Sequence, residues 1–270
     1  MIKVSNLYVY PIKSLGGFEC SSSKVTDRGL EFDRRWMLVD ENNRFISQRE
    51  FPPLALLTTH IANNILTVQH KNDIGIKIEI PISHYSETNS LVVIWDDTVI
   101  ANTINKVVDE WFSDILSRKC RLVYMADSSH RLVDKNYAHN SEITSLSDGY
   151  PFLLISKGSL SDLNARLESP IPMNRFRPNI VIEGCEPFFE DSMKSFLINN
   201  THFFGVKLCG RCVVTTINQD TGEKSEQTEP LRTLATYRTI DKKVRFGQNL
   251  LHKSTGVISV GDVVELKNED

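Results

Sequence analysis

Short runs of alternating apolar and polar residues dominate the first hundred positions, a pattern typical of β-strands with one face exposed to water. These runs cover residues 7–10, 34–40, 44–48, 54–62, 65–70, 74–80 and 91–95. Turn-forming residues separate them, among them Asp27-Arg28-Gly29 and Asn63-Asn64. Many short strands with regular turns predict a small β-barrel or sandwich in this half of the chain.

The spacing of apolar residues changes after position 103. If residues 104–119 form a helix, one face of it carries Val107, Val108, Trp111, Ile115 and Leu116. A strand at 120–125 and a polar, irregular loop at 126–147 are expected to follow. We place a domain boundary in this region.

The second half mixes strands with a few helices. Strands are predicted at 151–156, 179–184, 201–208, 213–218, 244–251 and 257–266. A helix at 160–167 is expected to have Ser159 as its N-cap, and a second helix is expected at 229–240. The predicted fold class is therefore α+β, mostly β.

Composition and charge exclude several classes of protein. The 270 residues carry a net charge of −3, so a general affinity for nucleic acid or for anionic membranes is not expected. No apolar run approaches the roughly 20 residues that span a bilayer, and the first residues do not form a secretion signal. We expect a cytoplasmic protein and, without a coiled-coil pattern, a monomer.

The five cysteines are too few and too unevenly spaced for a disulfide framework. Cys209 and Cys212 form a close pair in Cys209-Gly210-Arg211-Cys212. A structural zinc site would need a second pair, which the chain lacks. A thioredoxin-like dithiol normally begins a helix, whereas β-branched residues follow here. Two buried core cysteines remain the plainest alternative.

Several polar and basic residues lie where predicted strands end, and each taken singly reads as a solvated surface group. They are Lys13, Ser14, Arg34, Arg177, Asn179 and Arg211. Together they could bind a phosphate-bearing ligand, because arginine offers a bidentate fork and lysine a point charge. A thiolate beside such a pocket suits a transition metal that prefers soft ligands.

Motifs along nearly the whole chain resemble those of the MOSC-domain family in its two-part form with an N-terminal β-barrel domain. Within this family, the chain resembles the mitochondrial amidoxime reducing component and the bacterial YcbX-type reductases of N-hydroxylated bases. The motifs are YPIKSLGG (10–17), DRRWMLVD (33–40), SQRE (47–50), SDGYPFLLIS (147–156), NRFRPNIVIEGCEPFFED (174–191), CGRCVVTTINQDTG (209–222) and FGQN (246–249).

This resemblance implies an N-terminal β-barrel domain at residues 1–122, a MOSC β-barrel domain with a few helices at 123–270, and a molybdenum–molybdopterin cofactor. It implies that Cys212 is the metal ligand and a catalytic residue, and that Asp148 is a second catalytic candidate near the metal. The residues implied to bind the cofactor are Lys13, Ser14, Arg34, Asp148, Gly149, Arg177, Asn179 and Arg211. Asn218 and Gln219 depart from the family pattern, which often has acidic and proline residues there.

The implied activity is the two-electron reduction of the N–O bond in small N-hydroxylated compounds. No cysteine follows Cys212, so we expect no iron–sulfur domain, and electrons would come from a separate flavin or iron–sulfur reductase. We also expect no membrane anchor. Pyridoxal phosphate binding and detoxification of N-hydroxylated bases are further terms that the resemblance suggests.

Two alternatives remain open. One is a carrier of molybdenum cofactor or of sulfur that has no reductase turnover, and the other is a thiol–disulfide oxidoreductase that uses Cys209 and Cys212.

Overall fold

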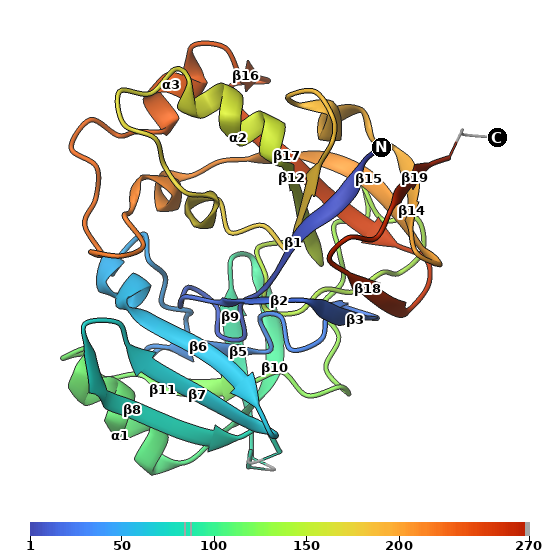
Figure 1. Cartoon of the computed structure of the whole chain (residues 1–270). Helices are drawn as coiled ribbons and strands as arrows, with labels where there is room; N and C mark the ends of the chain where they lie inside the picture. The colour runs from blue at the N-terminus through green and yellow to red at the C-terminus, as the bar shows by residue number, and fades with distance from the viewer. Residues whose placement is uncertain (84, 87, 268–270) are drawn as a thin grey trace.

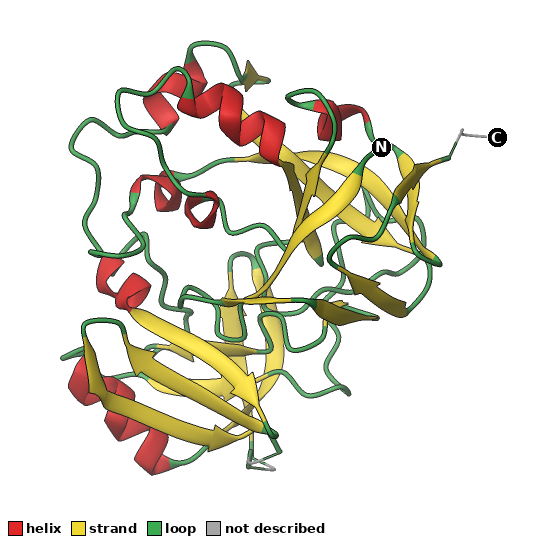
Figure 2. Ribbon diagram, viewed as in Figure 1, coloured by secondary structure: helices red, strands yellow, loops and turns green. Residues whose placement is uncertain are grey.

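The computed structural model describes residues 1–83, 85–86 and 88–267, and it is mostly β-structure, as predicted (Figure 2). The largest sheet has the strand order β19-β14-β15-β17-β12-β13-β1-β2, and β16 pairs with β17. Its strands are β1 (Lys3–Val9), β2 (Phe18–Cys20), β12 (Phe152–Ser156), β13 (Ile180–Glu183), β14 (Ser195–Ile198), β15 (Thr201–Gly210), β16 (Thr239–Ile240), β17 (Lys243–His252) and β19 (Val264–Leu266).

Three smaller sheets complete the β-structure, and their orders are β5-β11-β10-β9, β6-β7-β8 and β18-β3-β4. Their strands are β3 (Ser22–Thr26), β4 (Gly29–Leu30), β5 (Trp36–Val39), β6 (Leu57–Ala62), β7 (Ile65–His70), β8 (Asp73–Pro81), β9 (Asn89–Ile94), β10 (Asp97–Thr103), β11 (Arg121–Tyr124) and β18 (Gly256–Ser259). Figure 1 shows β6–β8 and α1 in one half of the molecule and the large sheet in the other.

The helices are short. The α-helices are α1 (Lys106–Ile115), α2 (Lys157–Asn164) and α3 (Leu231–Ala235), and the 3-10 turns are η1 (Pro52–Leu56), η2 (Met173–Arg175), η3 (Phe189–Ser192) and η4 (Val213–Thr216). Helix α1 buries Val108 and Phe112, on the apolar face that its sequence spacing predicts. Within the described residues, no helix is long and apolar enough to cross a bilayer.

The first strand ties the beginning of the chain to its second half. β1 pairs with β13 in antiparallel fashion, and its Leu7 and Val4 join a core that contains Phe196, Phe203 and Leu250. β3 likewise pairs with β18. The first thirty residues therefore pack with strands from the end of the chain, while the proposed division at residue 122 stays a prediction.

Local structure differs from the sequence prediction at several points. The segment predicted as a strand at 213–218 begins with the 3-10 turn η4, because the hydroxyl groups of Thr215 and Thr216 donate hydrogen bonds to the carbonyls of Cys212 and Val213. Threonine hydroxyls that bond to the backbone three residues earlier favour a turn over a strand.

Other predicted elements shift or shrink. Ser156, rather than Ser159, is the N-cap of α2, since its hydroxyl accepts a hydrogen bond from the amide of Ser159. Residues 44–48 make only isolated bridges, residues 54–56 belong to η1, and α3 covers only part of the helix predicted at 229–240. The prediction also missed β10 and β14.

Candidate functional site

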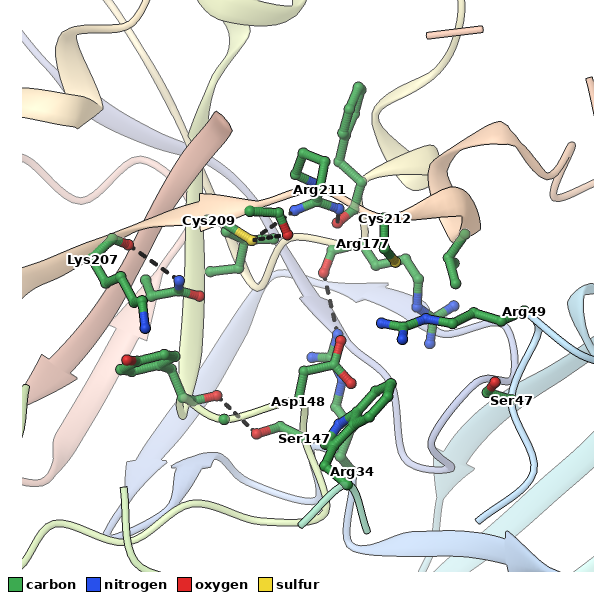
Figure 3. Close-up of a pocket in the computed structure, with 18 of the residues that line it drawn as sticks. Arg34, Ser47, Arg49, Ser147, Asp148, Arg177, Lys207, Cys209, Arg211 and Cys212 are labelled. Carbon is green, nitrogen blue, oxygen red and sulfur yellow. Dashed lines mark hydrogen bonds between the residues drawn. The ribbon is translucent and has the colours of Figure 1, made fainter. Parts of the chain in front are cut away.

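One cavity of about 650 Å³ lies between the two halves of the chain. All nine residues singled out in the sequence line it, and they are Lys13, Ser14, Arg34, Asp148, Gly149, Arg177, Asn179, Arg211 and Cys212. Figure 3 shows that side chains from segments far apart in the sequence converge on this space. The structure therefore brings together the whole predicted set, while their roles toward a ligand stay predictions.

Each of these residues belongs to a loop at the end of a strand. Lys13 and Ser14 follow β1, Arg34 precedes β5, and Asp148 lies before β12. Arg177 precedes β13, and the Cys209–Cys212 segment leaves β15 and enters η4. Loops carried by a rigid sheet commonly present the functional side chains of a protein.

Three of the nine predicted residues have backbones in the left-handed region that favours glycine. The φ angle is 70° at Ser14, 49° at Arg34 and 56° at Arg177. For residues with a Cβ atom this conformation costs energy, and it persists only where surrounding contacts hold it. Such positions cluster at binding sites, which supports a functional reading of these loops.

Four residues form what we call the inner cluster: Lys13, Arg34, Asp148 and Arg177. The Lys13 ammonium donates a hydrogen bond of 2.6 Å to Asp148 Oδ1. Burial lowers the pKa of Lys13, and Asp148 partly offsets that effect. The surrounding cavity walls would by themselves raise the pKa of Asp148, whose side chain is still 73% exposed, but Lys13, Arg49 and Arg34 hold it well below its usual range. Asp148 is therefore an anion at neutral pH.

The two arginines of the inner cluster stack on one aromatic ring. The guanidinium carbons of Arg34 and Arg177 each lie 4.3 Å from the centroid of the Tyr10 ring, within the range of a cation–π contact. Arg34 Nη1 lies 2.8 and 2.6 Å from the carboxylate oxygens of Asp33, and Arg34 Nη2 donates to the Arg177 carbonyl.

The side chain of Arg177 makes no hydrogen bond to any described residue. Burial, with the nearby charge of Arg34, lowers its pKa to about 10, so it stays a cation at neutral pH. An unpaired, partly buried guanidinium that lines a cavity is a ready partner for a phosphate or carboxylate.

A buried arginine outside the predicted set shapes the Asp148 loop. Arg131 donates hydrogen bonds to the carbonyls of Ser145 and Ser147, at 3.2 and 2.7 Å, and a longer one of 3.3 Å to the carbonyl of Asp148. Its Nε lies 2.7 Å from Asp97 Oδ2. Beyond this loop, a Cβ added to Gly149 would meet no atom within 4 Å, so Gly149 faces open space.

Arg211 separates the two cysteines of the predicted ligand segment, as Figure 3 shows. Its Nη1 lies 3.1 Å from Cys209 Sγ, and its Nη2 donates to the Phe176 carbonyl at 2.7 Å. Its buried Nε has no partner among the described residues. Cys209 and Cys212 are both free thiols, and no hydrogen bond to a described residue engages the Cys212 sulfur.

Asn179 and Ser14 differ in how far their polar groups are already engaged. The Asn179 amide accepts from the Leu153 amide at 3.2 Å and donates to the Tyr8 carbonyl at 3.3 Å. It therefore holds β1, β12 and β13 together at the edge of the cavity. The Ser14 carbonyl accepts a 2.6 Å hydrogen bond from Gln48, which fixes the backbone of the loop at this point.

The sequence analysis missed several basic residues in the cavity lining. The guanidinium carbon of Arg49 lies 4.2 Å from the centroid of the Trp95 ring. Arg49 belongs to the SQRE motif at 47–50, but the sequence analysis assigned it no role. Lys207, Lys242 and Lys243, which we call the outer lysines, make no ion pair with any described residue. With Arg245, the lining contains nine lysines and arginines and one carboxylate, Asp148. Only the tertiary arrangement reveals this charge excess, because the whole chain is acidic.

The excess of positive charge suits an anionic ligand. The side chains of the cavity also limit which metal sites are possible. Among the described residues, no group of three or more His, Cys, Asp or Glu side chains could hold a metal ion. That finding gives no support to a zinc site. The thiols of Cys209 and Cys212 are soft donor atoms that the cavity offers to a metal.

Comparisons with known proteins agree along the whole chain. The family described as the MOSC N-terminal beta barrel domain matches residues 1–119, and the MOSC domain matches residues 142–265. Mitochondrial amidoxime-reducing component 1 from Mus musculus is 33% identical over 284 residues, covering 97% of this chain and 82% of that protein. Component 2 from Rattus norvegicus is 33% identical over 279 residues with the same coverage.

A second kind of relative is longer. Molybdenum cofactor sulfurase from Solanum lycopersicum is 33% identical over 270 residues, which cover 90% of this chain but only 32% of the sulfurase. This chain therefore matches about one third of that protein.

Proposed function

Since the chain belongs to the family in which an N-terminal MOSC β-barrel domain precedes a MOSC domain, we propose that it binds a molybdenum–molybdopterin cofactor and reduces N-hydroxylated compounds by two electrons. The observation that carries the proposal is the cavity itself, in which unpaired cations lie beside the free thiol of Cys212. The printed names of the amidoxime-reducing relatives support the reaction class.

The residues present fit such a cofactor. Arg177, Arg34 and Lys13 would hold its phosphate, and the partnerless Nε of Arg211 offers one further donor. The Cys212 thiolate would bind the metal. When bound, the molybdenum centre supplies the two-electron chemistry that breaks the N–O bond.

The ion pair with Lys13 restricts the part that Asp148 can play. Its low pKa means that the carboxylate is ionised throughout the neutral range, so it accepts hydrogen bonds and does not act as a proton donor. We propose that Asp148 orients a hydrogen-bond donor of the cofactor or substrate while it holds the Lys13 ammonium in place. A separate donor protein would supply the electrons, and the cytoplasmic location stays a prediction.

Molybdenum content tests the ligand assignment. We expect near-stoichiometric molybdenum in the wild-type protein from a host that makes the cofactor, and loss of that metal in Cys212→Ala. Cys209→Ala is the matched control, because it removes a thiol from the same turn while leaving Cys212. Wild-type protein without molybdenum, from a host that loads a relative well, would overturn the proposal. Equal loss in both variants would remove the special role of Cys212.

The likeness to molybdenum cofactor sulfurase favours one alternative, a carrier of cofactor or of sulfur. Turnover separates the two functions. A reductase consumes an N-hydroxylated compound in the presence of an artificial electron donor, and it stops doing so in Cys212→Ala. A carrier would retain molybdenum and show no turnover. Reduction of disulfides by a metal-free preparation would instead support dithiol chemistry at Cys209 and Cys212.

A further inference from the structure

The outer lysines leave a strong local charge uncompensated. Lys207 Nζ lies 4.0 Å from the centroid of the Tyr137 ring and 5.8 Å from that of Tyr150, and it has no carboxylate partner among the described residues. Figure 3 places Lys207 on the side of the cavity opposite Arg49. Lys207 and Arg49 therefore contribute positive charge to opposite sides of the cavity.

The other two outer lysines come from the hairpin between β16 and β17. Lys242 has a left-handed backbone with a φ of 60°, together with Asp241 at 50°, so the tip of the hairpin turns tightly. The Lys243 side chain passes close to Gly210, where an added Cβ would lie 3.6 Å from its Cδ. Lys243 is thus held beside the turn that carries Cys209 and Cys212.

Tyr150, whose ring lies near Lys207, adds no negative charge to this side of the cavity. The buried Tyr150 hydroxyl has no partner among the described residues. Burial, reinforced by Asp134 and Tyr137, raises the pKa of Tyr150 well above its ordinary value, so the phenol keeps its proton. Tyr150, Tyr137 and Phe176 also supply aromatic surface on which a planar ring could stack.

The charge of a bound cofactor would not use up these cations. One phosphate needs two or three basic partners, and the inner cluster already provides them. The outer lysines would then remain positive in the same cavity, where they attract anions and repel cations.

We propose that the positive field of the outer lysines favours substrates with an anionic group, so that the preferred substrates are N-hydroxylated compounds that carry a phosphate. This inference rests on the proposed function and specifies the substrate class for the same site. A phosphate monoester gains more from this field than a carboxylate because it carries up to two charges.

The test uses a matched pair of compounds, N-hydroxycytidine and its monophosphate. Binding of each to the oxidised protein, without electron donor, is measured by isothermal titration calorimetry. We expect the monophosphate to bind about tenfold more tightly, which corresponds to about 1.4 kcal/mol, since interactions between solvated charges are weak. The advantage should shrink as salt is added.

A charge-matched pair of variants locates the effect. The triple variant Lys207→Gln, Lys242→Gln, Lys243→Gln should lose most of the tenfold advantage. The control variant Lys24→Gln, Lys77→Gln, Lys157→Gln removes the same net charge from surface ion pairs outside the cavity and should keep it. If the advantage survives unchanged in the outer-lysine variant, these lysines do not select the phosphate and the proposal is wrong.

Turnover with an artificial donor separates this inference from the proposed function. Tighter binding of the monophosphate, with neither compound reduced, would support the anion site and overturn the reductase. Equal binding of both compounds, with both reduced at the same kcat/KM, would support the reductase and overturn the anion site.

Discussion

The inner cluster and the outer lysines carry charge of the same sign in one cavity, yet they are built differently. The side chains of Lys13 and Arg34 are nearly buried, at 7% and 12% exposure, and each is paired with a carboxylate. The outer lysines make no ion pair with any described residue, and two of them, Lys242 and Lys243, are exposed.

The difference shows two ways of using positive charge. Desolvation of a cation is costly, so Lys13 and Arg34 are each paired with a carboxylate, while the Arg177 guanidinium is left for a bound anion. Solvated lysines need no partner and act through their field over a distance. We infer that the inner cluster positions a bound group, whereas the outer lysines select what approaches it.

The largest expected effect comes from Arg177→Gln in the inner cluster. Loss of a charge-assisted contact to phosphate should weaken cofactor retention by at least about 30-fold, which corresponds to about 2 kcal/mol. Molybdenum content after dialysis measures the effect. Arg166→Gln removes an arginine that pairs with Asp162 on the surface and serves as the control. Equal retention in the two variants would mean that Arg177 does not hold the cofactor.

The next effect concerns the support beneath the inner cluster. Gln48 and Gln219 form a buried amide pair, with hydrogen bonds of 3.2 and 3.0 Å, and Gln48 also holds the Ser14 carbonyl. Gln219→Ala leaves the buried Gln48 amide oxygen without its donor and should lower the free energy of unfolding by about 1–3 kcal/mol. Urea denaturation measures it, with the exposed Gln227→Ala as control. No difference between them would show that the pair adds no stability.

Removing one partner of the Lys13–Asp148 ion pair should lower the free energy of unfolding by different amounts, depending on which partner is removed. Asp148→Asn leaves the buried Lys13 ammonium unpaired and should cost about 1 kcal/mol, a low value for such a change because the Asp148 side chain is 73% exposed. Lys13→Met removes the buried charge and leaves a solvated carboxylate, so it should cost less. Urea denaturation of both variants compares them, and a larger loss in Lys13→Met would contradict the assignment of Lys13 as the desolvated partner.

The same pair predicts a pH dependence. The folded pKa of Asp148 is depressed, so its contribution to stability is fully present above the unfolded pKa of about 4 and is lost as the pH falls toward the folded value. The stability difference between wild type and Asp148→Asn should therefore be constant from about pH 8 to pH 5 and shrink below pH 4. Urea denaturation across this range checks it. A difference that grows with acidity would reverse the sign of the linkage.

The smallest effect is expected at the outer lysines. Lys242→Gln and Lys243→Gln remove no ion pair with a described residue, so each should change the free energy of unfolding by less than about 0.5 kcal/mol. Their effect should be confined to anion binding. A loss above about 1 kcal/mol would show that these lysines stabilise the fold. The outer lysines and the inner cluster would then not differ in their contribution to stability.

Local patterns predicted the regular half of the molecule well. The alternation in 65–70 and 74–80 corresponds to β7 and β8, and the helical spacing in 104–119 corresponds to α1. Each of these elements buries one face, and such burial requires apolar residues at regular spacing in the sequence. The predicted strand at 213–218 was wrong because hydrogen bonds from the Thr215 and Thr216 hydroxyls stabilise a turn there. Such hydrogen bonds produce no regular spacing of apolar residues.

By itself, the sequence determined the strand-rich fold class and the order of motifs that identifies the family. It also identified the nine candidate residues, because each of them belongs to one of the family's motifs.

Only the tertiary structure decided which charges share a space and which are already paired. It showed that Lys13 meets Asp148, that Arg177 lacks a partner among the described residues, and that the outer lysines face the same cavity. These facts depend on contacts between residues more than a hundred positions apart in the chain, and the energy of a charge depends on its solvation and its neighbours rather than on its place in the sequence.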